Sequence, residues 1–512
     1  MSKPIVLVNF YSPKSLGIRY LEGALRAAGF EVVVVYFKGF HSVHPQKPTP
    51  EEINALVSLI REKQPLFTGF SVMSSLYLEA VTAISQAVRG CTDPPSPLVW
   101  GGVYATLFPG RCLPYCDYVL RGEGEGAIVD LAERLRDGTD LSDMENLAYL
   151  PDAPAQLSTV HSPLSTVVNA VRPLVTDLDS LQMAPLGTGE KYSIEGMLKR
   201  GDPSLTSVSY ETSCSRGCPF VCAYCSTVSL KRIYRDENRH YMRFRSVEAV
   251  ITELKAAKAA MKNLSIIHFW DEIFSSDKAW IEEFTQKYRA EIGLPFDIWA
   301  HPLRTDMELI AALRRAGLYQ VVMGIQSGSP SVRKTAFHRT ETQEQILAAA
   351  QVFTDAKVPR VIYDLILRHP FESLAELKES YALCARLPGR FTLQMHGLNF
   401  LPGTDIVEEA VKRGLFTPEQ LEEMMYAPME KQYASWWEAD TPDPDVNFWY
   451  RLIYLTQFPS MKKKAARLAR DKEEGKPSAD GAAAKCYARA KKMARMRHIW
   501  QKGWAVLKGK VS

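Results

Sequence analysis

The sequence has no run of about eighteen apolar residues, the length that a helix needs to cross a lipid bilayer. Its first eight residues are too few for a secretory signal, so we expect them to enter a buried strand. The chain of 512 residues has nine cysteines, and four of them fall within residues 214–225. This distribution argues against a disulfide framework. We therefore expect a cytoplasmic protein without a transmembrane segment.

Most of the chain carries no excess of positive charge. The net charge is +4, yet residues 461–512 alone carry 16 Lys and Arg against 4 Asp and Glu. A basic segment of this kind binds nucleic acid in some proteins, and in others it forms helices with solvated charged faces. The many alanines among these charges favour helices, so we do not expect nucleic acid as a partner.

The most informative stretch is a cysteine-rich loop at residues 213–225, called the cysteine loop below. Cys218, Cys222 and Cys225 are spaced C-x3-C-x2-C directly after the apolar segment 208–212. Three thiolates are one fewer than a structural zinc or a closed iron–sulfur cluster uses. A [4Fe–4S] cluster on three cysteines leaves one iron open to chelate a small molecule. A zinc site with Cys214 as the fourth ligand is the alternative, although its spacing is unlike paired C-x2-C zinc motifs.

The cysteine loop resembles the radical S-adenosylmethionine (SAM) superfamily in this spacing and in the aromatic residue between its last two cysteines. The resemblance covers residues 206–415. It implies that Cys218, Cys222 and Cys225 hold a [4Fe–4S] cluster. It also implies the following SAM contacts: Tyr224 and Ile366 at the adenine, Asp271 and Glu272 at the methionine amino group, and Gln326 and Ser327 at the ribose hydroxyls.

Two qualifications belong to this resemblance. A carboxylate suits an ammonium group, but a helix N-cap is the alternative role for Asp271. Residues 368–372 replace both glycines of the Gly-x-Pro-Gly-Glu run that many family members have. Asp364, Pro370, Glu372 and residues 400–404 keep the pattern of cobalamin-dependent members such as the anaerobic magnesium-porphyrin cyclase group.

Residues 1–135 alternate apolar strand-like runs with helical periodicity. This alternation predicts an α/β fold with a doubly wound, Rossmann-like parallel sheet. Ligands of such sheets lie at the carboxyl ends of the strands. The corresponding loops are residues 69–75, 100–106 and 121–125.

Taken in order, these three loops resemble the cobalamin-binding domain that precedes many radical SAM domains. The resemblance implies cobalamin contacts from Ser71, Val72, Met73, Gly101, Gly102, Tyr104 and Glu123. The Asp-x-His-x-x-Gly motif, which gives a histidine to cobalt in some cobalamin proteins, is absent. The resemblance therefore implies cobalamin without a protein histidine from that motif, and a sheet domain without any cofactor is the alternative.

The sequence divides into four segments. Residues 1–135 are the sheet domain, and residues 136–205 are expected to form a connector with a short helix near 193–199. Residues 206–415 hold about six β/α units, too few for a closed eight-stranded barrel, so we expect an open, partial (β/α)6 barrel. Residues 416–512 are expected to be helical. Their aromatic-rich part either packs on the barrel or, with Met424, Met425 and Met429, lines a substrate pocket.

Together these features predict a cobalamin-dependent radical SAM enzyme, in particular a C-methyltransferase acting on a small molecule, a lipid or a natural-product intermediate. Such an enzyme needs a one-electron reductant, and we expect a flavodoxin or a ferredoxin. The alternatives are a radical SAM cyclase or rearrangement enzyme without net methylation, and a nucleic-acid-modifying or nucleic-acid-binding protein that uses the basic C-terminal segment. The sequence identifies neither the substrate nor a catalytic residue.

Overall fold

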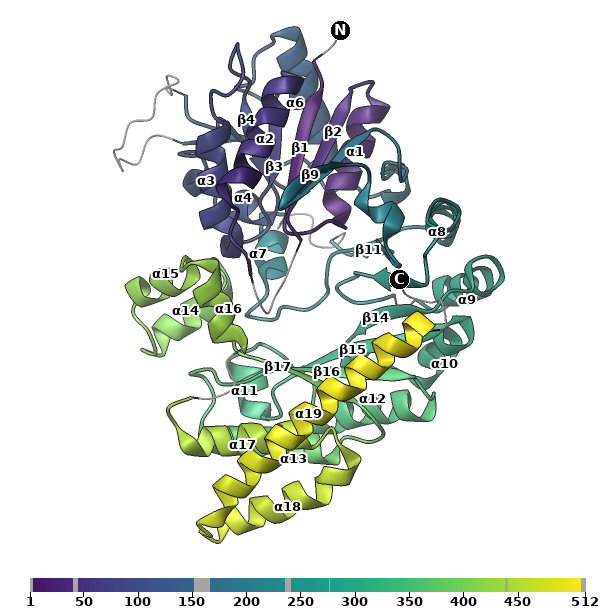
Figure 1. Ribbon diagram of the computed structural model, residues 1–512, viewed down its shortest axis with the longest axis vertical. Helices are drawn as coiled ribbons and strands as arrows, with labels where there is room; N and C mark the ends of the chain where they lie inside the picture. The colour runs from purple at the N-terminus through teal and green to yellow at the C-terminus, as the bar shows by residue number, and fades with distance from the viewer. Residues whose placement is uncertain are drawn as a thin grey trace.

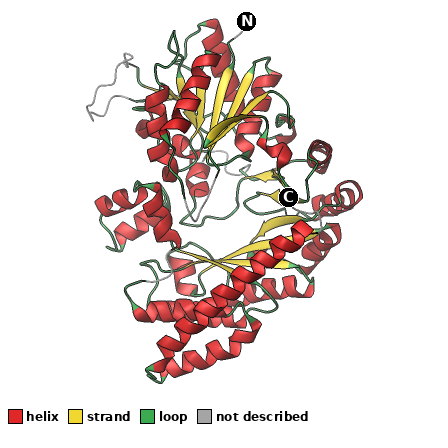
Figure 2. Ribbon diagram, viewed as in Figure 1, coloured by secondary structure: helices red, strands yellow, loops and turns green. Residues whose placement is uncertain are grey.

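The computed structural model describes residues 3–39, 45–151, 166–234, 241–275, 277–437 and 441–507. Two sheets dominate it, one above the other in Figure 1, and helices cover both (Figure 2). The upper sheet belongs to the N-terminal part of the chain and the lower sheet to the central part. No helix of the described residues is long and apolar enough to cross a membrane.

The first sheet has the strand order β7-β6-β5-β4-β3-β1-β2-β8-β9 among the described residues. Its five central strands are parallel. They are β1 (Ile5–Phe10), β2 (Val32–Phe37), β3 (Thr68–Ser71), β4 (Leu98–Gly101) and β5 (Tyr118–Leu120). The strand order reverses between β1 and β3, which makes this the doubly wound sheet that the sequence predicts.

Helices bury both faces of this sheet, as its continuous apolar strands require. The helices α1 (Leu16–Ala27) and α6 (Glu125–Asp137) pack on one face. The helices α2 (Pro50–Lys63) and α3 (Leu78–Val88) pack on the other. Short elements follow two strand ends: a 3-10 turn at Ser75–Tyr77, α4 (Val103–Leu107) and α5 (Pro109–Cys112). The sheet domain below means this sheet with these helices.

The connector expectation for residues 136–205 needs a correction, because this segment adds four strands to the first sheet. They are β6 (Leu147–Tyr149), β7 (Val167–Val168), β8 (Glu190–Glu195) and β9 (Met197–Arg200). The short helix expected near 193–199 is wrong, since these residues form the β8–β9 hairpin. The physical reason is pairing: β8 lies parallel to β2 and satisfies the backbone groups along its edge.

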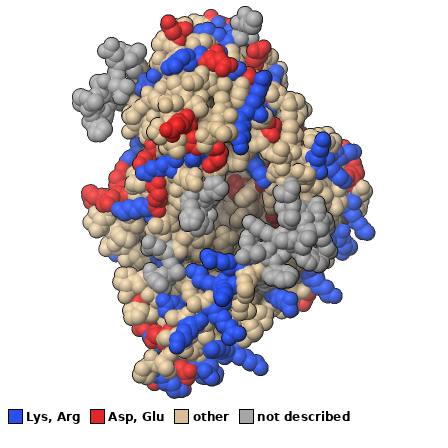
Figure 3. All heavy atoms as spheres, viewed as in Figure 1, with Lys and Arg blue, Asp and Glu red and all other residues tan. Residues whose placement is uncertain are grey.

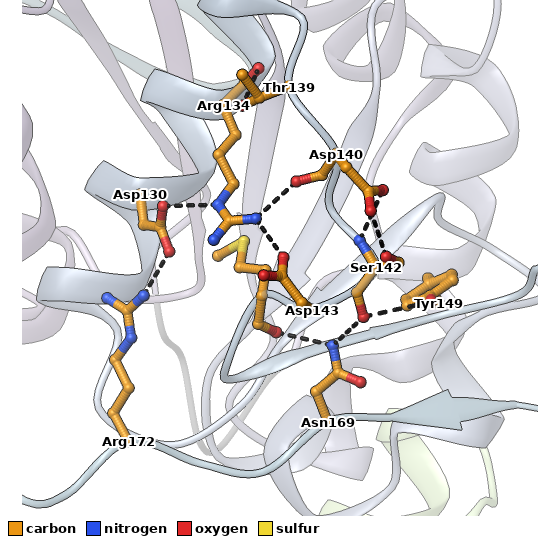
Figure 4. A network of polar contacts seen from close by, with 10 residues as sticks. Asp130, Arg134, Thr139, Asp140, Ser142, Asp143, Tyr149, Asn169 and Arg172 are labelled. Carbon is orange, nitrogen blue, oxygen red and sulfur yellow. Dashed lines mark hydrogen bonds and ion pairs between the residues drawn. The ribbon is translucent and has the colours of Figure 1, made fainter.

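A polar network fixes the β6–β7 side of the sheet to α6 (Figure 4). Arg134 on α6 donates to Asp130 at 2.9 Å and to Asp143 at 2.5 Å. The Asn169 amide, next to β7, donates to the Ser142 carbonyl at 2.9 Å. The network anchors the added strands to the helix that follows β5.

The second sheet has six parallel strands in sequence order, β10-β13-β14-β15-β16-β17. This order confirms the open, partial barrel. The strands are β10 (Ser209–Thr212), β13 (Ile266–Phe269), β14 (Phe296–Ala300), β15 (Leu318–Gln326), β16 (Arg360–Ile366) and β17 (Thr392–His396). The helices on its outer face are α8 (Val247–Ala260), α9 (Lys278–Lys287), α10 (Met307–Ala316), α12 (Gln343–Asp355) and α13 (Leu374–Arg386).

Side chains alternate between the two faces of each barrel strand. The outward ones, such as Ile267 and Met323, form the main core with the helices. The inward ones are largely polar or aromatic and are called the inner wall below. They include Glu211, His268, Trp270, Asp297, Trp299, Gln320, Gln326, Asp364, Ile366, Gln394 and His396.

The C-terminal helices divide between the two sheets. The helices α15 (Pro418–Met425) and α16 (Met429–Trp437) reach the sheet domain, where Met429 and Tyr433 join its core. The helices α17 (Pro444–Leu455), α18 (Pro459–Glu473) and α19 (Ser478–Leu507) pack on the barrel. The α19 helix crosses the front of the barrel in Figure 1. The basic segment is therefore helical over its described residues, with buried alanines and Cys486 on the barrel side.

Candidate active site

The cysteine loop leads from β10 to α7 (Ser226–Ile233) at the carboxyl end of the barrel strands. Two backbone hydrogen bonds hold its centre: the Ala223 amide donates to the Phe337 carbonyl at 3.0 Å, and the Ile406 amide donates to the Ala223 carbonyl at 2.9 Å. The thiols of Cys218, Cys222 and Cys225 are free and half-buried. The loop thus presents three thiols from one fixed turn of backbone.

Cys214 differs from these three cysteines. Its side chain is fully buried in the main core, and burial raises the pKa of its thiol well above the usual range. Within the described part of the chain, no three His, Cys, Asp or Glu side chains are arranged to hold a single metal ion. The complete burial of Cys214 in the core makes it a core residue and does not favour it as a fourth zinc ligand.

A buried arginine that the sequence analysis missed lies beside the thiols. Arg339 Nη1 is 4.0 Å from Cys222 Sγ and donates to the Tyr224 hydroxyl at 3.3 Å, while its Nε donates to Glu341 at 2.6 Å. Burial raises the pKa of the Cys218 thiol to about 12, and it also raises the pKa of Cys222, where Arg339 opposes it. A buried thiolate needs a positive charge nearby, which a guanidinium or a bound metal supplies.

The two acidic residues after β13 have different surroundings. Asp271 is buried, accepts a hydrogen bond from the Cys214 amide at 2.9 Å and binds the Ser215 hydroxyl. Burial raises its pKa to about 7. Glu272 is exposed, and its charge acts on Cys218. Asp271 thus supports the cysteine loop from within, and Glu272 is the carboxylate available to an ammonium group.

The four other residues expected at SAM also differ in their burial and in their hydrogen-bond partners. Ile366 is buried in one apolar cluster with Ala223 and Phe337, and Tyr224 packs against that cluster. Gln326 has a φ of 66° at a bulge of β15, and its Oε1 is buried without a partner among the described residues. Ser327 is fully buried and its hydroxyl accepts from the Ser329 amide at 3.1 Å. Its contact with a ribose stays a prediction, and this burial does not favour it.

Asp364 is a second unpaired acceptor on the inner wall. On β16 it pairs with Gly324 of β15 on one side and with Gln394 of β17 on the other. Its side chain is only 8% exposed. Its Oδ1 has no hydrogen-bond partner among the described residues, and burial raises its pKa to about 7. An unpaired buried carboxyl of this kind is costly without a ligand, so it marks a position where a donor group is expected.

The lower part of the inner wall holds a connected polar group. His268 Nδ1 lies 2.5 Å from Asp297 Oδ2, to which the Gln320 amide also donates at 3.2 Å. Although burial lowers the pKa of His268, the bond to Asp297 raises it overall. Beside this group, the Trp270 indole binds Glu211 and is 54% exposed. An exposed indole above hydrogen-bonded polar groups offers a surface on which a small molecule can stack.

The strand-end loops of the sheet domain are held together by hydrogen bonds between backbone groups. The Val72 amide donates to the Gly101 carbonyl at 2.7 Å, and the Tyr104 amide donates to the Val72 carbonyl at 3.1 Å. Gly102 has a φ of 96°, and a Cβ there would lie 2.8 Å from the Val72 carbonyl oxygen. Only glycine allows these loops to approach so closely.

The side chains expected at cobalamin vary in accessibility along these loops. Ser71 is half-buried and Met73 is 48% exposed, so both are accessible at the strand ends. Val72 and Tyr104 are buried, and the Tyr104 hydroxyl lies 3.5 Å from that of Tyr426. The loops therefore offer mostly backbone, Ser71 and Met73 to a ligand.

Glu123, also expected at cobalamin, has protein partners instead. Its carboxylate accepts from Arg243 at 2.8 and 3.0 Å, from Arg216 at 3.2 Å and from the Val175 amide at 3.0 Å. Both arginines belong to the central domain: Arg216 lies within the cysteine loop, and Arg243 pairs with it across a short two-stranded sheet. The expected cobalamin contact from this side chain is not favoured, because four donors already surround the carboxylate.

The two sets of loops face each other. Lys14, after β1, donates to Glu211 on β10 at 3.3 Å, and the Glu123 contacts bridge the same boundary. The surface is hollowed between the upper and lower parts of the molecule (Figure 3). The carboxyl ends of both sheets thus open toward a common space.

The residues present fit the expected groups by their chemistry. The cysteine loop provides three thiols with a guanidinium beside them, and Gln326 and Asp364 provide unpaired buried acceptors. The sheet domain provides a glycine cradle at Gly102 that a side chain would fill. These are suitable sites for an iron–sulfur cluster, for the donor groups of SAM and for a large planar cofactor, respectively.

The aromatic-rich C-terminal stretch was expected either to pack on the barrel or to line a substrate pocket, and its residues differ in this respect. Met429 packs in the core of the sheet domain and Met425 in the apolar cluster under the cysteine loop, whereas Met424 is exposed. The Trp436 ring contacts the inner-wall His396 edge-on at 5.4 Å. Packing therefore accounts for most of this stretch, and Trp436 is the residue that reaches the inner wall.

Two family comparisons match the two domains. The family described as the radical SAM superfamily matches residues 212–384, and the B12 binding domain family matches residues 3–132. The chain therefore carries a radical SAM domain preceded by a B12-binding domain.

Individual relatives agree with this assignment. The cytidylyl-2-hydroxyethylphosphonate methyltransferase of Streptomyces wedmorensis is 23% identical over 442 residues, which cover 79% of each chain. The anaerobic magnesium-protoporphyrin IX monomethyl ester cyclase of Rubrivivax gelatinosus is 22% identical over 347 residues, 66% of this chain and 56% of the cyclase. The relatives thus include both a methyltransferase and a cyclase.

Solved structures share the fold. The radical SAM methyltransferase TsrM from Kitasatospora setae, with cobalamin and a [4Fe–4S] cluster bound, has a TM-score of 0.59 at 17% identity over 80% of this chain and 78% of that one. The cobalamin-dependent SAM radical enzyme OxsB, with aqua-cobalamin bound, has a TM-score of 0.60 at 16% identity over 94% of this chain and 72% of that one. Both expected domains are confirmed in kind and order.

Proposed function

We propose that this chain is a cobalamin-dependent radical SAM enzyme that transfers a methyl group to a carbon atom of a small molecule. The observation that carries the proposal is the shared space between the cysteine loop and the strand-end loops of the sheet domain. A substrate held there lies between the sites expected for two cofactors. When bound, the cluster supplies the electron that cleaves SAM, and cobalamin carries the methyl group.

The residues of the cysteine side hold and orient SAM. Cys218, Cys222 and Cys225 would hold the iron–sulfur cluster, which would bind the methionine end of SAM. Glu272 accepts from its ammonium group, because this carboxylate is exposed next to Cys218. Tyr224 and Ile366 lie against the adenine, which the shared apolar cluster supports.

The part of the inner wall around His268 and Trp270 binds the substrate. The Trp270 ring offers a stacking face, and the His268–Asp297 pair offers a polar anchor below it. A substrate and cofactors that filled this space would displace water from it, which would protect reactive species. A small flavodoxin or ferredoxin is the expected electron donor in a reducing cytoplasm.

Anaerobic purification and reconstitution test the proposal. The intact protein should bind iron, sulfide and cobalamin, and with a reductant it should form 5′-deoxyadenosine from SAM. A folded protein that takes up neither cofactor would contradict the proposal. Comparing metabolites of a deletion strain with its parent, with methyl-labelled SAM, then identifies the product.

The cyclase alternative is kept because a cyclase is among the relatives. It predicts 5′-deoxyadenosine formation with a product that carries no label from the SAM methyl group. A labelled product excludes it. For the nucleic-acid alternative, one face of α18 and α19 is buried against the barrel, which agrees with helices that pack and keep their charged faces in solvent.

A further inference from the structure

The cluster of charges around Glu123 joins the two domains at a position close to both cofactor sites. Arg216 lies in β11 (Ser215–Arg216), two residues before Cys218, and Arg243 lies opposite it in β12 (Arg243–Phe244). Both guanidinium groups leave this two-stranded sheet and reach the same carboxylate in the loop after β5. The cysteine loop is thus tied directly to the sheet domain.

The contacts are numerous and specific. The two Glu123 oxygens accept from both terminal nitrogens of Arg243, at 2.8 and 3.0 Å, and Arg216 adds bonds to Glu123 at 3.2 Å and to Glu125 at 2.6 Å. Arg243 and Glu123 also bind the carbonyl and the amide of Val175, at 2.8 and 3.0 Å. A bidentate arginine pair fixes orientation as well as distance.

The sheet-domain side of this cluster continues to the glycine cradle. The Gly122 amide, next to Glu123, donates to the Thr106 hydroxyl at 3.0 Å. Thr106 belongs to α4, which starts directly after Gly102. Hydrogen bonds and one short helix therefore connect the arginine pair to the loop at which a cobalamin is expected.

We propose that Glu123 is a positioning residue that sets the cysteine loop at a fixed distance and angle to the Gly101–Gly102 loop. This inference rests on the proposed function and replaces the expected contact between the Glu123 side chain and cobalamin. Methyl transfer from SAM to cobalt requires atoms held by different domains to meet. Reductive cleavage of SAM requires only the cysteine side, and cobalamin binding requires only the sheet domain.

The experiment compares the intact full chain with Glu123→Gln, which keeps the size of the side chain and removes its charge. Three quantities are measured after anaerobic reconstitution: cofactor content, 5′-deoxyadenosine formation, and methyl transfer from SAM to reduced cobalamin. Glu123→Gln should keep the first two within about twofold and lower methyl transfer roughly 10- to 100-fold, because small misplacements of reacting groups cost this much. Glu133→Gln, an exposed change on α6, is the matched control and should alter none of them.

A second readout uses the protein without cofactors. Hydrogen exchange of the Val175 amide should become faster in Glu123→Gln, since that amide loses a charged acceptor. Arg243→Gln should reproduce both effects from the other side, and the double variant should be no worse than either single variant, as expected for one shared interaction.

Each other result overturns the inference. Loss of cobalamin from Glu123→Gln would mean that the side chain contacts the cofactor. Unchanged methyl transfer would mean that other contacts set the arrangement. If Glu123→Gln does not fold, Arg243→Lys takes its place. Equal losses of methyl transfer and of 5′-deoxyadenosine formation in that variant would overturn the inference. Failure of the unaltered chain to bind cobalamin would instead contradict the proposed function.

Discussion

The cysteine loop and the strand-end loops of the sheet domain face one space, but they are built from different parts of the chain. The cysteine side presents side chains: three thiols, the exposed Glu272 and the unpaired Gln326. The sheet-domain side presents backbone that glycine keeps accessible, while Val72 and Tyr104 are buried. The comparison indicates that removing a functional group damages the first site and adding an atom damages the second.

The largest effect is expected at the cysteine side. Cys222→Ser should abolish cluster binding and 5′-deoxyadenosine formation, because three ligands on one loop leave none to spare. Iron and sulfide analysis with electron paramagnetic resonance measures the cluster. Cys91→Ser in the sheet domain is the matched control, and an equal loss there would show that general thiol damage, not ligation, is responsible.

The next effect tests the backbone side. Gly102→Ala places a Cβ 2.8 Å from the Val72 carbonyl oxygen at a φ of 96°. We expect a stability loss of about 2–3 kcal/mol and weaker cobalamin binding, measured by denaturation and by absorbance titration. Gly29→Ala has a similar φ of 86° with open space around it, so it should lose only about 1 kcal/mol. Equal losses of stability in both variants would show that the close approach of Gly102 to Val72 adds nothing to the cost.

A third prediction concerns the unpaired Asp364 on the inner wall. Burial raises its pKa from 3.8 to about 7, so the folded protein binds the proton more tightly than the unfolded chain does. Its contribution to stability is complete below pH 4 and is lost as the pH rises to about 7. Asp364→Asn should therefore stabilise the cofactor-free protein at pH 8 by up to about 4 kcal/mol and change little at pH 4.

Urea unfolding at the two pH values measures this difference. Asp297→Asn is the comparison, since Asp297 has partners in His268 and Gln320 and its replacement should destabilise. A loss of stability in Asp364→Asn at pH 8 would contradict the unpaired state of that carboxyl.

The smallest effect concerns Tyr104. Tyr104→Phe removes only the 3.5 Å contact with the Tyr426 hydroxyl, so about 0.5–1 kcal/mol of stability should be lost. Cobalamin affinity should stay unchanged, because the ring is buried in the sheet-domain core. A marked loss of cobalamin affinity would show that the hydroxyl reaches the cofactor after all.

Much of the site could be predicted because its signals are local. The three cysteines lie within eight residues, and glycines at strand ends follow from strand periodicity. The inner-wall residues also follow from alternation, once each strand is located. Arg339 gave no such signal, since it lies 115 residues after Tyr224, in a segment without a motif.

The strands within residues 136–205 give no local signal for a related reason. Residues 190–200 have no strong periodicity, and β8 forms because it completes the edge of β2. Pairing between strands this far apart in the chain depends on the finished sheet. Local propensity could not reveal it.

The sequence alone determined the two domains, their order and the three thiols, because ligand spacing and strand alternation are properties of short segments. Tertiary structure alone decided which polar groups are already paired. It placed Cys214 in the core, gave Asp271 to the cysteine loop and gave Glu123 to Arg216 and Arg243. These assignments depend on which distant segments meet, because a buried charge takes the partner that the fold brings within hydrogen-bond distance.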